Sequence, residues 1–431
     1  AKAANSADMQ IINLDASKIE TVNNASPYDD ETVATYRVEG EEIEANSFNG
    51  SHPVEEVTVA KIENPNLKDV YDGKYSLEEF VAQMSVEQLA TLAEGIGWSS
   101  GGTPVIGSES DSVPGAAGET TKNYLKDLGI PNIVLADGPA GVRISQSFEG
   151  EDAETGETQT YYQFCTAWPI GTLQACTWDV DLVEKVGKAA AVEAHNNGID
   201  IWLAPGMNIH RDPLCGRNFE YYSEDPLLAG KMAASLTTGC QSEGVAISLK
   251  HFAANNKETN RSSSDSRVSE RALREIYLKG FEIAVKEADP WTIMSSYNLI
   301  NGVETAESEE LLTDILRGEW GYEGLVETDW GNNSNHAFEL KAGNDVKMPT
   351  GSPETLKNAF EKGFITRDEL LRSAERLMNL VMKVNTFHDK IADPITVDIG
   401  ADTTFKAAEN ILWSETVKAE GTSDEDGGKN L

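Results

Sequence analysis

The polar residues of greatest chemical interest follow or end short apolar runs of the sequence. Asp137 ends IVLAD, Lys250 and His251 lie in VAISLKHF, and Asp329 and Trp330 end GLVETDW. A carboxylate such as Asp329 can attack an electrophilic carbon. In retaining glycoside hydrolysis a second carboxylic acid, about 5–5.5 Å away, protonates the leaving oxygen. A plainer interpretation is that Asp329 caps the helix that follows it.

Cationic residues accompany these carboxylates. Arg143 lies in DGPAGVR, Arg217 in PLCGRNFEYYSEDP and Arg261 in KHFAANNKETNR. Positive charge near a carboxylate favours its ionised form, and the same side chains can donate hydrogen bonds to a polar ligand. The alternative is simple ion pairing, for instance of Arg217 with Glu220 or Glu224.

The elements that position these residues alternate along the chain. Apolar runs cover residues 133–137, 199–205, 245–252, 292–297, 324–330 and 345–348, and helical patterns cover 181–195, 269–288 and 366–384. Apolar runs without alternation are typical of parallel strands buried on both faces. Because nearly every run ends in polar residues, we predict an α/β fold with a (β/α)8 TIM-like barrel, whose strand ends meet at one face. Two strands are not located, and a doubly wound open sheet is the rival fold.

The remaining segments differ from this pattern. Residues 1–70 predict an N-terminal arm or linker with short strands, 71–387 the barrel, and 388–431 a linker followed by the start of another module. Capping boxes predict helices after Ser76, Ser85 and Thr366. The chain opens without Met or a secretory signal, so we expect a processed product or an internal fragment, with a secreted or cell-surface location favoured slightly over a cytoplasmic one.

Five motifs lie in order between about residues 130 and 350: LADGPAGVR, LAPGMNIHRDPLCGRNFEYYSEDP, KHFAANNKETNR, IMSSYNLING and VETDWG. Together they resemble glycoside hydrolase family 3, in its β-glucosidase branch. The resemblance implies an exo-acting, retaining β-glucosidase with Asp329 as the nucleophile and Trp330 lining the −1 subsite. It also implies that seven further residues hold the sugar: Asp137, Arg143, Arg217, Lys250, His251, Arg261 and Tyr297.

The resemblance also bears on the acid/base group. The segment KHFAANNKETNR differs from the KHFPGHG of the N-acetylglucosaminidase branch, and no second His follows it. The resemblance therefore implies an acid/base Glu from an α/β-sandwich domain. Neither end of this chain has room for such a domain of about 200 residues. We expect the complementary domain or chain to be a partner, with a β-glucoside or cello-oligosaccharide as substrate.

The C-terminal stretch FKAAENILWSETVKAEGTSDEDGGKNL resembles the opening of a family 6 carbohydrate-binding module, and a disordered acidic tail is the alternative. Three alternatives to β-glucosidase activity stay open. The barrel could bind carbohydrate without catalysis, it could serve only assembly, or it could act on β-xylosides or β-galactosides.

The charge balance favours a neutral ligand. Asp and Glu number 72 against 35 Lys and Arg, a net charge of −37, which disfavours nucleic acid and anionic membranes as partners. A plainer reason for this acidity is solubility. The four cysteines show no zinc spacing, and we expect neither a metal nor a cofactor.

Overall fold

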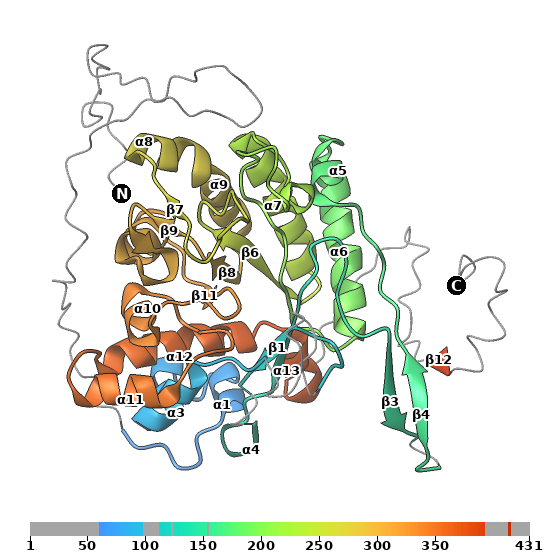
Figure 1. Ribbon diagram of the computed structural model, residues 1–431. Coiled ribbons are helices and arrows are strands. Elements are labelled where there is room, and N and C mark those ends of the chain that lie inside the picture. The colour runs from blue at the N-terminus through green and yellow to red at the C-terminus, as the bar shows by residue number, and fades with distance from the viewer. Residues whose placement is uncertain (1–59, 98–111, 122–124, 153–154, 393–412, 415–431) are drawn as a thin grey trace, which may run out of the picture. The chain divides into compact units, whose positions relative to one another are not determined.

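The structure is a computed structural model that describes residues 60–97, 112–121, 125–152, 155–392 and 413–414 (Figure 1). Its central sheet has the strand order β1-β2-β5-β6-β8-β11. The strands are β1 (Gly118–Thr120), β2 (Ile133–Ala136), β5 (Ile201–Trp202), β6 (Ala246–Phe252), β8 (Thr292–Ser295) and β11 (Leu325–Thr328).

Two short extended segments close this sheet into a barrel. Val346 bridges to Glu327 of β11 in parallel, and its neighbour Lys347 bridges in parallel to Glu94. Ile96 then pairs antiparallel with Glu119 of β1, through two backbone hydrogen bonds of 2.7 and 2.8 Å. The ring therefore has eight members, which confirms the predicted barrel and locates the two missing strands at residues 94–96 and 118–120.

One strand departs from the expected all-parallel arrangement. β1 runs antiparallel to β2, with Gly118 opposite Leu135. The two strands are joined by residues 121–132, and the only helix among the described residues of this connection is the four-residue α4 (Leu125–Leu128). A parallel crossover usually contains a full helix, whereas antiparallel neighbours need none.

Helices surround the barrel, and three of them begin at the predicted caps. Ser76, Ser85 and Thr366 each form the predicted capping box. The α-helices are α1 (Leu67–Tyr71), α2 (Leu77–Val81), α3 (Val86–Leu92), α5 (Gly171–Ala175), α6 (Val180–Asn196), α7 (Pro226–Gln241), α8 (Glu270–Ala272), α9 (Lys279–Ala288), α10 (His336–Ala342), α11 (Pro353–Glu361), α12 (Arg367–Val381) and α13 (Asn385–Lys390).

The predicted helix over residues 269–288 is interrupted. Between α8 and α9, residues Leu273–Tyr277 form a π-helical turn, η4, and a second π-helix, η6, covers Glu310–Glu319. Two 3₁₀ turns, η3 (Asn218–Glu220) and η5 (Thr305–Glu307), lie in loops.

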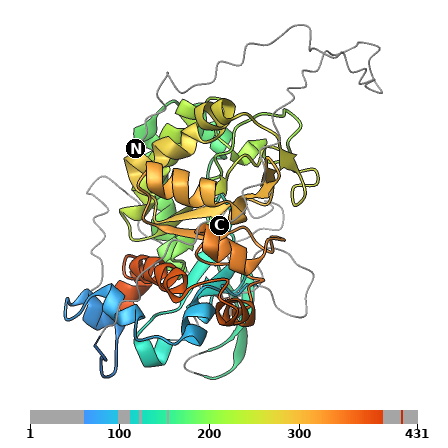
Figure 2. The same cartoon turned by 90° about the vertical axis from the view of Figure 1, so that its left-hand side faces the viewer.

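The hydrophobic core packs helices from the early and the late part of the described chain against the sheet. Leu67, Phe80 and Leu377 are fully buried in one cluster with the strand residue Ile133. Figure 2 shows the red α12 beside the blue N-terminal helices, in agreement with the contacts of α12 with α2 and α3. Leu67 thus packs into the core although it precedes the expected start of the barrel at residue 71.

The helices α6, α7 and α9 lie side by side along one flank of the sheet (Figure 1). Small residues allow the close approach of α6 and α7. A Cβ atom on Gly239 would lie only 2.1 Å from the backbone oxygen of Glu184. No side chain larger than hydrogen fits at this crossing.

Short strands outside the barrel form two further sheets. β3 (Ser147–Glu151) and β4 (Thr158–Tyr162) make an antiparallel hairpin, to which β12 (Trp413–Ser414) adds at β4. β10 (Val303–Glu304), β9 (Leu299–Ile300) and β7 (Asp265–Ser266) form the other sheet. The predicted strands of the N-terminal arm and most of the C-terminal stretch, including the predicted module, fall outside the described residues.

Candidate active site

Asp329 is the first residue after β11 and lies at the carboxyl end of the barrel strands. Its backbone N–H donates to the Ser295 carbonyl of the neighbouring β8 at 3.2 Å, and its residue surface is 8% exposed. The Oδ1 atom accepts the backbone N–H of Trp330 at 2.7 Å. The helix that follows, α10, is capped by Asn335. The interpretation of Asp329 as a helix cap is therefore wrong.

Two electrostatic effects act in opposite directions on the pKa of Asp329. Burial raises the pKa of its carboxyl above the ordinary value. The positive charges of Arg217, Lys250 and Arg261 act in the other direction, as does the Trp330 N–H. These cations offset part of the cost of holding a buried carboxylate in the ionised form that a nucleophile requires.

His251 lies next to this carboxylate. Its Nε2 is 3.7 Å from Oδ2 of Asp329, and its Nδ1 lies 3.2 Å from both the Tyr221 hydroxyl and Oδ1 of Asn208. Burial, followed by the charges of Arg217 and its cationic neighbours, lowers the pKa of His251 well below its usual range. The imidazole is therefore neutral near pH 7 and can offer one N–H to a ligand.

Asp137 forms a charged group with Lys250 and Arg143. Its Oδ1 lies 2.7 Å from Nζ of Lys250, and its Oδ2 is bound by the Arg143 guanidinium. Burial alone would raise the pKa of Asp137, but the two cations outweigh it and hold the pKa at about 2. The Lys250 side chain is 4% exposed, whereas that of Arg143 is 48% exposed, at the edge of the group.

Arg217 and Arg261 form a second charged group. Arg217 pairs with Glu220, as the plainer interpretation of the sequence proposed. Its Nη1 also lies 4.0 Å from Oε1 of Glu258, and Nη1 of Arg261 donates to Oε2 of Glu258 at 3.0 Å. Pairing does not remove Arg217 from the site, because its charge still acts on Asp329.

Tyr297 and Trp330 bound the site on the side of β8 and β11. The Tyr297 hydroxyl donates to the Trp330 carbonyl, and the Arg261 guanidinium lies 4.6 Å from the centre of the Tyr297 ring. The Trp330 indole N–H donates to the Ala117 carbonyl at 2.9 Å, and Trp330 is only 3% exposed. Trp330 is thus part of the packed core beneath Asp329.

The structure brings the predicted residues to one end of the barrel. Asp137, Lys250 and Asp329 follow or end β2, β6 and β11, and ion pairs or close contacts link them to the others. Glu258, Tyr221 and Asn208 were not predicted as parts of the site. Glu258 stands three residues before Arg261, a spacing that could have indicated an ion pair.

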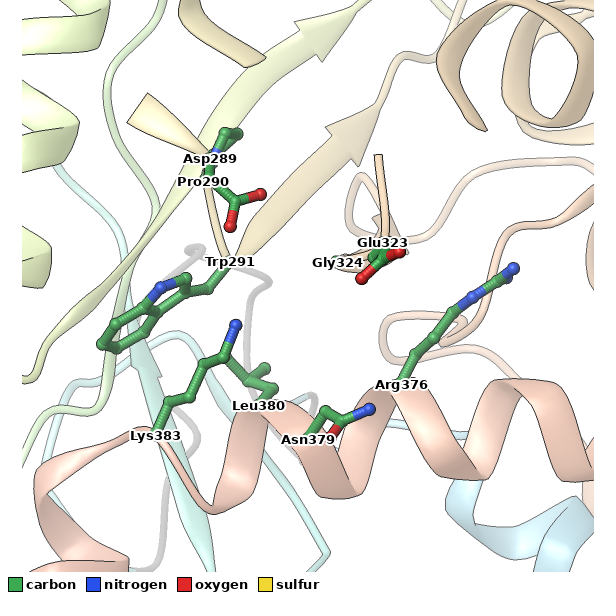
Figure 3. Close-up of a pocket in the computed structure, with 9 residues that line it drawn as sticks. All are labelled: Asp289, Pro290, Trp291, Glu323, Gly324, Arg376, Asn379, Leu380 and Lys383. Atoms are coloured by element: carbon green, nitrogen blue, oxygen red, sulfur yellow. The ribbon is translucent and has the colours of Figure 1, made fainter. Parts of the chain in front are cut away.

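A separate pocket of about 160 Å³ lies at the opposite end of the barrel (Figure 3). Trp291 and Gly324 immediately precede β8 and β11, and they line the pocket together with Arg376 and Lys383 of the C-terminal helical region. In barrels of this type the amino-terminal end of the strands serves stability, and the carboxyl end holds the chemistry. The pocket is therefore not part of the candidate active site.

Two further kinds of feature are absent from the described residues. None of the described helices is long and apolar enough to cross a membrane. Within the same residues, no group of three or more His, Cys, Asp or Glu side chains is arranged to hold a metal ion.

The chain resembles known glycosidases over most of the barrel. Residues 134–380 match the glycosyl hydrolase family 3 N terminal domain. β-Glucosidase A of Butyrivibrio fibrisolvens is 47% identical over 304 residues, which are 70% of this chain and 33% of that protein. An exo-α-(1→6)-L-arabinopyranosidase of Bifidobacterium longum is 44% identical over 260 residues, 60% of this chain and 34% of that protein.

A solved structure supports the same relationship. β-Glucosidase 3B of Thermotoga neapolitana, in complex with α-D-glucose, has 42% identity and a TM-score of 0.65, and the match covers 73% of this chain and 43% of that one. The chain spans about a third of the length of the curated relatives it matches. On its sequence match and its barrel, the chain belongs to glycosyl hydrolase family 3.

Proposed function

We propose that the barrel is the catalytic part of a retaining β-glucosidase, with Asp329 as the nucleophile. The observation that carries this proposal is the position of Asp329: a buried carboxylate at the carboxyl end of β11, beside a neutral His251 and within the field of three cations. Its attack on the anomeric carbon of a terminal β-glucoside breaks the glycosidic C–O bond and forms a covalent glycosyl ester. The aglycone leaves with its oxygen protonated by the acid/base group, and water then hydrolyses the ester to glucose and free Asp329.

The surrounding residues suit recognition of sugar hydroxyls. Asp137 has a pKa of about 2 and is ionised at neutral pH, so its two oxygens can accept hydrogen bonds from two hydroxyls. Lys250, Arg143 and the neutral His251 supply donors on the same side. Arg217 and Arg261 supply further donors, and Trp330 forms the packed floor. The Tyr297 hydroxyl donates its proton to the Trp330 carbonyl, so it can only accept from the sugar. Such bonds add several kcal/mol when they strengthen in the transition state.

The sugar itself is proposed to be glucose. β-Glucosidases are among the relatives and the solved structures, and one of these structures holds glucose. A relative named as an arabinopyranosidase has 44% identity, however, so overall similarity of the barrel does not by itself fix the sugar. The hydroxymethyl group, which glucose has and pentoses lack, is the feature that we assign to Asp137.

We further propose that the acid/base Glu comes from a domain or chain beyond the barrel. Among the described residues, the carboxylates other than Asp329 that contact the cations of the site are already engaged: Asp137 and Glu258 by cations, and Glu220 by Arg217. Glu327 lies on β11 two residues before Asp329 and accepts a hydrogen bond from Ser248 at 2.7 Å, inside the barrel. None of these four is placed to protonate a leaving oxygen on the open side of a bound sugar.

Two substrates separate the two parts of this proposal. The dinitrophenolate of dinitrophenyl 2-deoxy-2-fluoro-β-glucoside leaves without protonation, so the 431-residue chain should release about one equivalent and become inactive. Cellobiose has a poor leaving group and should be cleaved hardly at all until the complementary domain is added. Absence of dinitrophenolate release would refute the nucleophile. Cleavage of cellobiose by the chain alone, at about 1–1000 per second, would refute the external acid.

A further inference from the structure

Glu258 holds a central place in the site that sugar recognition does not explain. It lies in the loop between β6 and β7, and its two carboxylate oxygens are divided between two guanidinium groups. Oε2 accepts from Arg261 at 3.0 Å, and Oε1 lies 4.0 Å from Arg217. The side chain of Glu258 is 21% exposed, so solvent screens these contacts only in part.

The two arginines depend on Glu258 to different degrees. Arg217 has a second carboxylate partner in Glu220. Arg261 has no other carboxylate within 4.0 Å among the described residues, and its remaining contact is the face of the Tyr297 ring. Without Glu258, Arg261 would lose its ion-pair partner, and less negative charge would offset the two guanidinium groups.

The same carboxylate begins a chain of polar contacts that ends at the nucleophile. Asn255, which is 1% exposed, donates to Oε1 of Glu258 at 3.1 Å, and its Nδ2 lies 3.3 Å from the Tyr221 hydroxyl. That hydroxyl is 3.2 Å from Nδ1 of His251, whose other ring nitrogen lies 3.7 Å from Asp329. Both of these contacts of Asn255 use its Nδ2, and its Oδ1 has no hydrogen-bond partner among the described residues, so Glu258 and the Tyr221 hydroxyl are what hold this amide in place.

We propose that Glu258 is a positioning residue that holds Arg217 and Arg261 in the orientation in which they bind the sugar. This inference rests on the proposed function, because it assigns the arginines to substrate binding. Glu258 itself need not touch the substrate. Its effect on Arg261 is direct, through a charge-assisted hydrogen bond of 3.0 Å. Its effect on Arg217, at 4.0 Å, is the attraction of opposite charges.

The inference is tested through labelling of the 431-residue chain by dinitrophenyl 2-deoxy-2-fluoro-β-glucoside. In Glu258→Gln the amide keeps the shape and one acceptor oxygen but loses the charge. The second-order labelling constant should fall by about 10- to 100-fold, as expected for a displacement of binding groups by about 1 Å. The half-saturating concentration should account for most of this fall, and the limiting labelling rate for little of it.

Matched variants distinguish positioning from a general loss of structure. The control is Glu354→Gln. Glu354 also pairs with a cation three residues later, Lys357, and their charged atoms lie 3.2 Å apart on the surface. This variant should label like the wild type. Glu258→Asp retains the charge and should recover part of the loss. Arg261→Lys combined with Glu258→Gln should cost less than the product of the two single effects, because both remove the same contact.

The outcomes separate the two proposals. If the wild type is labelled and Glu258→Gln labels within twofold of it, the positioning role is wrong and the proposed function stands. If Glu258→Gln does not fold, Glu258→Asp is combined with Arg261→Lys instead. A labelling loss in this double variant equal to the product of the two single losses would also overturn the role. If the wild type is not labelled at all, the proposed function fails, and the positioning role fails with it.

Discussion

Replacement of Lys250 by Met tests whether the ion pair with Asp137 holds the site together. Lys250 and Asp137 are 2.7 Å apart, with side chains only 4% and 16% exposed. Met fills a similar volume without charge. It would leave Asp137 with Arg143 alone, at the exposed edge of the site.

The magnitude follows from the pKa of Asp137. That pKa lies at about 2 rather than 3.8, because the two cations outweigh the effect of burial. At about 1.4 kcal/mol for each pKa unit, this lowering is worth about 2.5 kcal/mol at neutral pH. The contribution is present above pH 3.8 and is lost as the pH falls through 2. Removal of one partner of a buried pair typically costs about 3–5 kcal/mol, so we expect a loss of about 2–5 kcal/mol.

The assay is equilibrium unfolding in urea at pH 7. The control is Lys231→Met, because Lys231 also lies 2.7 Å from its partner, Glu287, but these side chains are 45% and 43% exposed. That variant should lose less than about 1 kcal/mol. The double variant Asp137→Asn/Lys250→Met should recover much of the loss, since no unpaired charge remains. Equal losses in Lys250→Met and Lys231→Met would refute this reasoning.

Three further predictions concern single carboxylates. Asp329→Asn should abolish labelling by the fluoroglucoside without lowering the urea midpoint at pH 7, because the neutral amide avoids the cost of burying a charge, which raises the pKa of Asp329. Residual labelling, or a clear loss of stability, would contradict this. Asp137→Ala should weaken glucose binding by about 1–3 kcal/mol by calorimetry, through loss of an acceptor and through the unpaired Lys250, and xylose binding by less; equal losses would refute the assignment to the hydroxymethyl group. Burial raises the pKa of Glu327 to about 7 from 4.5, so the stability that its protonated form provides is full below pH 4.5 and is lost as the pH rises through 7. Glu327→Gln should therefore flatten the fall of the urea midpoint between pH 4.5 and about pH 7, and an unchanged pH dependence would count against the buried position of this carboxyl.

The sequence predicted the barrel from six of its eight strands, and the two that it missed have a physical reason. Residues 94–96 are Glu-Gly-Ile and residues 118–120 are Gly-Glu-Thr, so neither forms an apolar run. Both are too short to show a hydrophobic period. Because β1 is antiparallel to β2, the chain between them has no long helical pattern that would indicate a βαβ unit. Backbone pairing with neighbours, which the local sequence does not encode, makes them strands.

The site was predictable where residue type and strand end coincide. Asp137, Lys250 and Asp329 follow or end apolar runs, and parallel strands necessarily bring such ends together. The contact of Glu258 with Arg217 was not predictable in this way, because it joins the loops after β5 and β6. The conformation of those loops has no sequence period. Likewise, the helix cap that the alternative interpretation placed at Asp329 belongs to Asn335, six residues later in the chain.

The central claim is that Asp329 is the nucleophile, and the most direct test is to locate the covalent label. The 431-residue chain is inactivated with dinitrophenyl 2-deoxy-2-fluoro-β-glucoside, digested at low pH to preserve the ester, and mapped by tandem mass spectrometry. The account predicts one fluoroglucosyl group, on Asp329 in the segment GLVETDWG. A label on Asp137, on Glu258 or on any other carboxylate, with Asp329 unmodified, would contradict it.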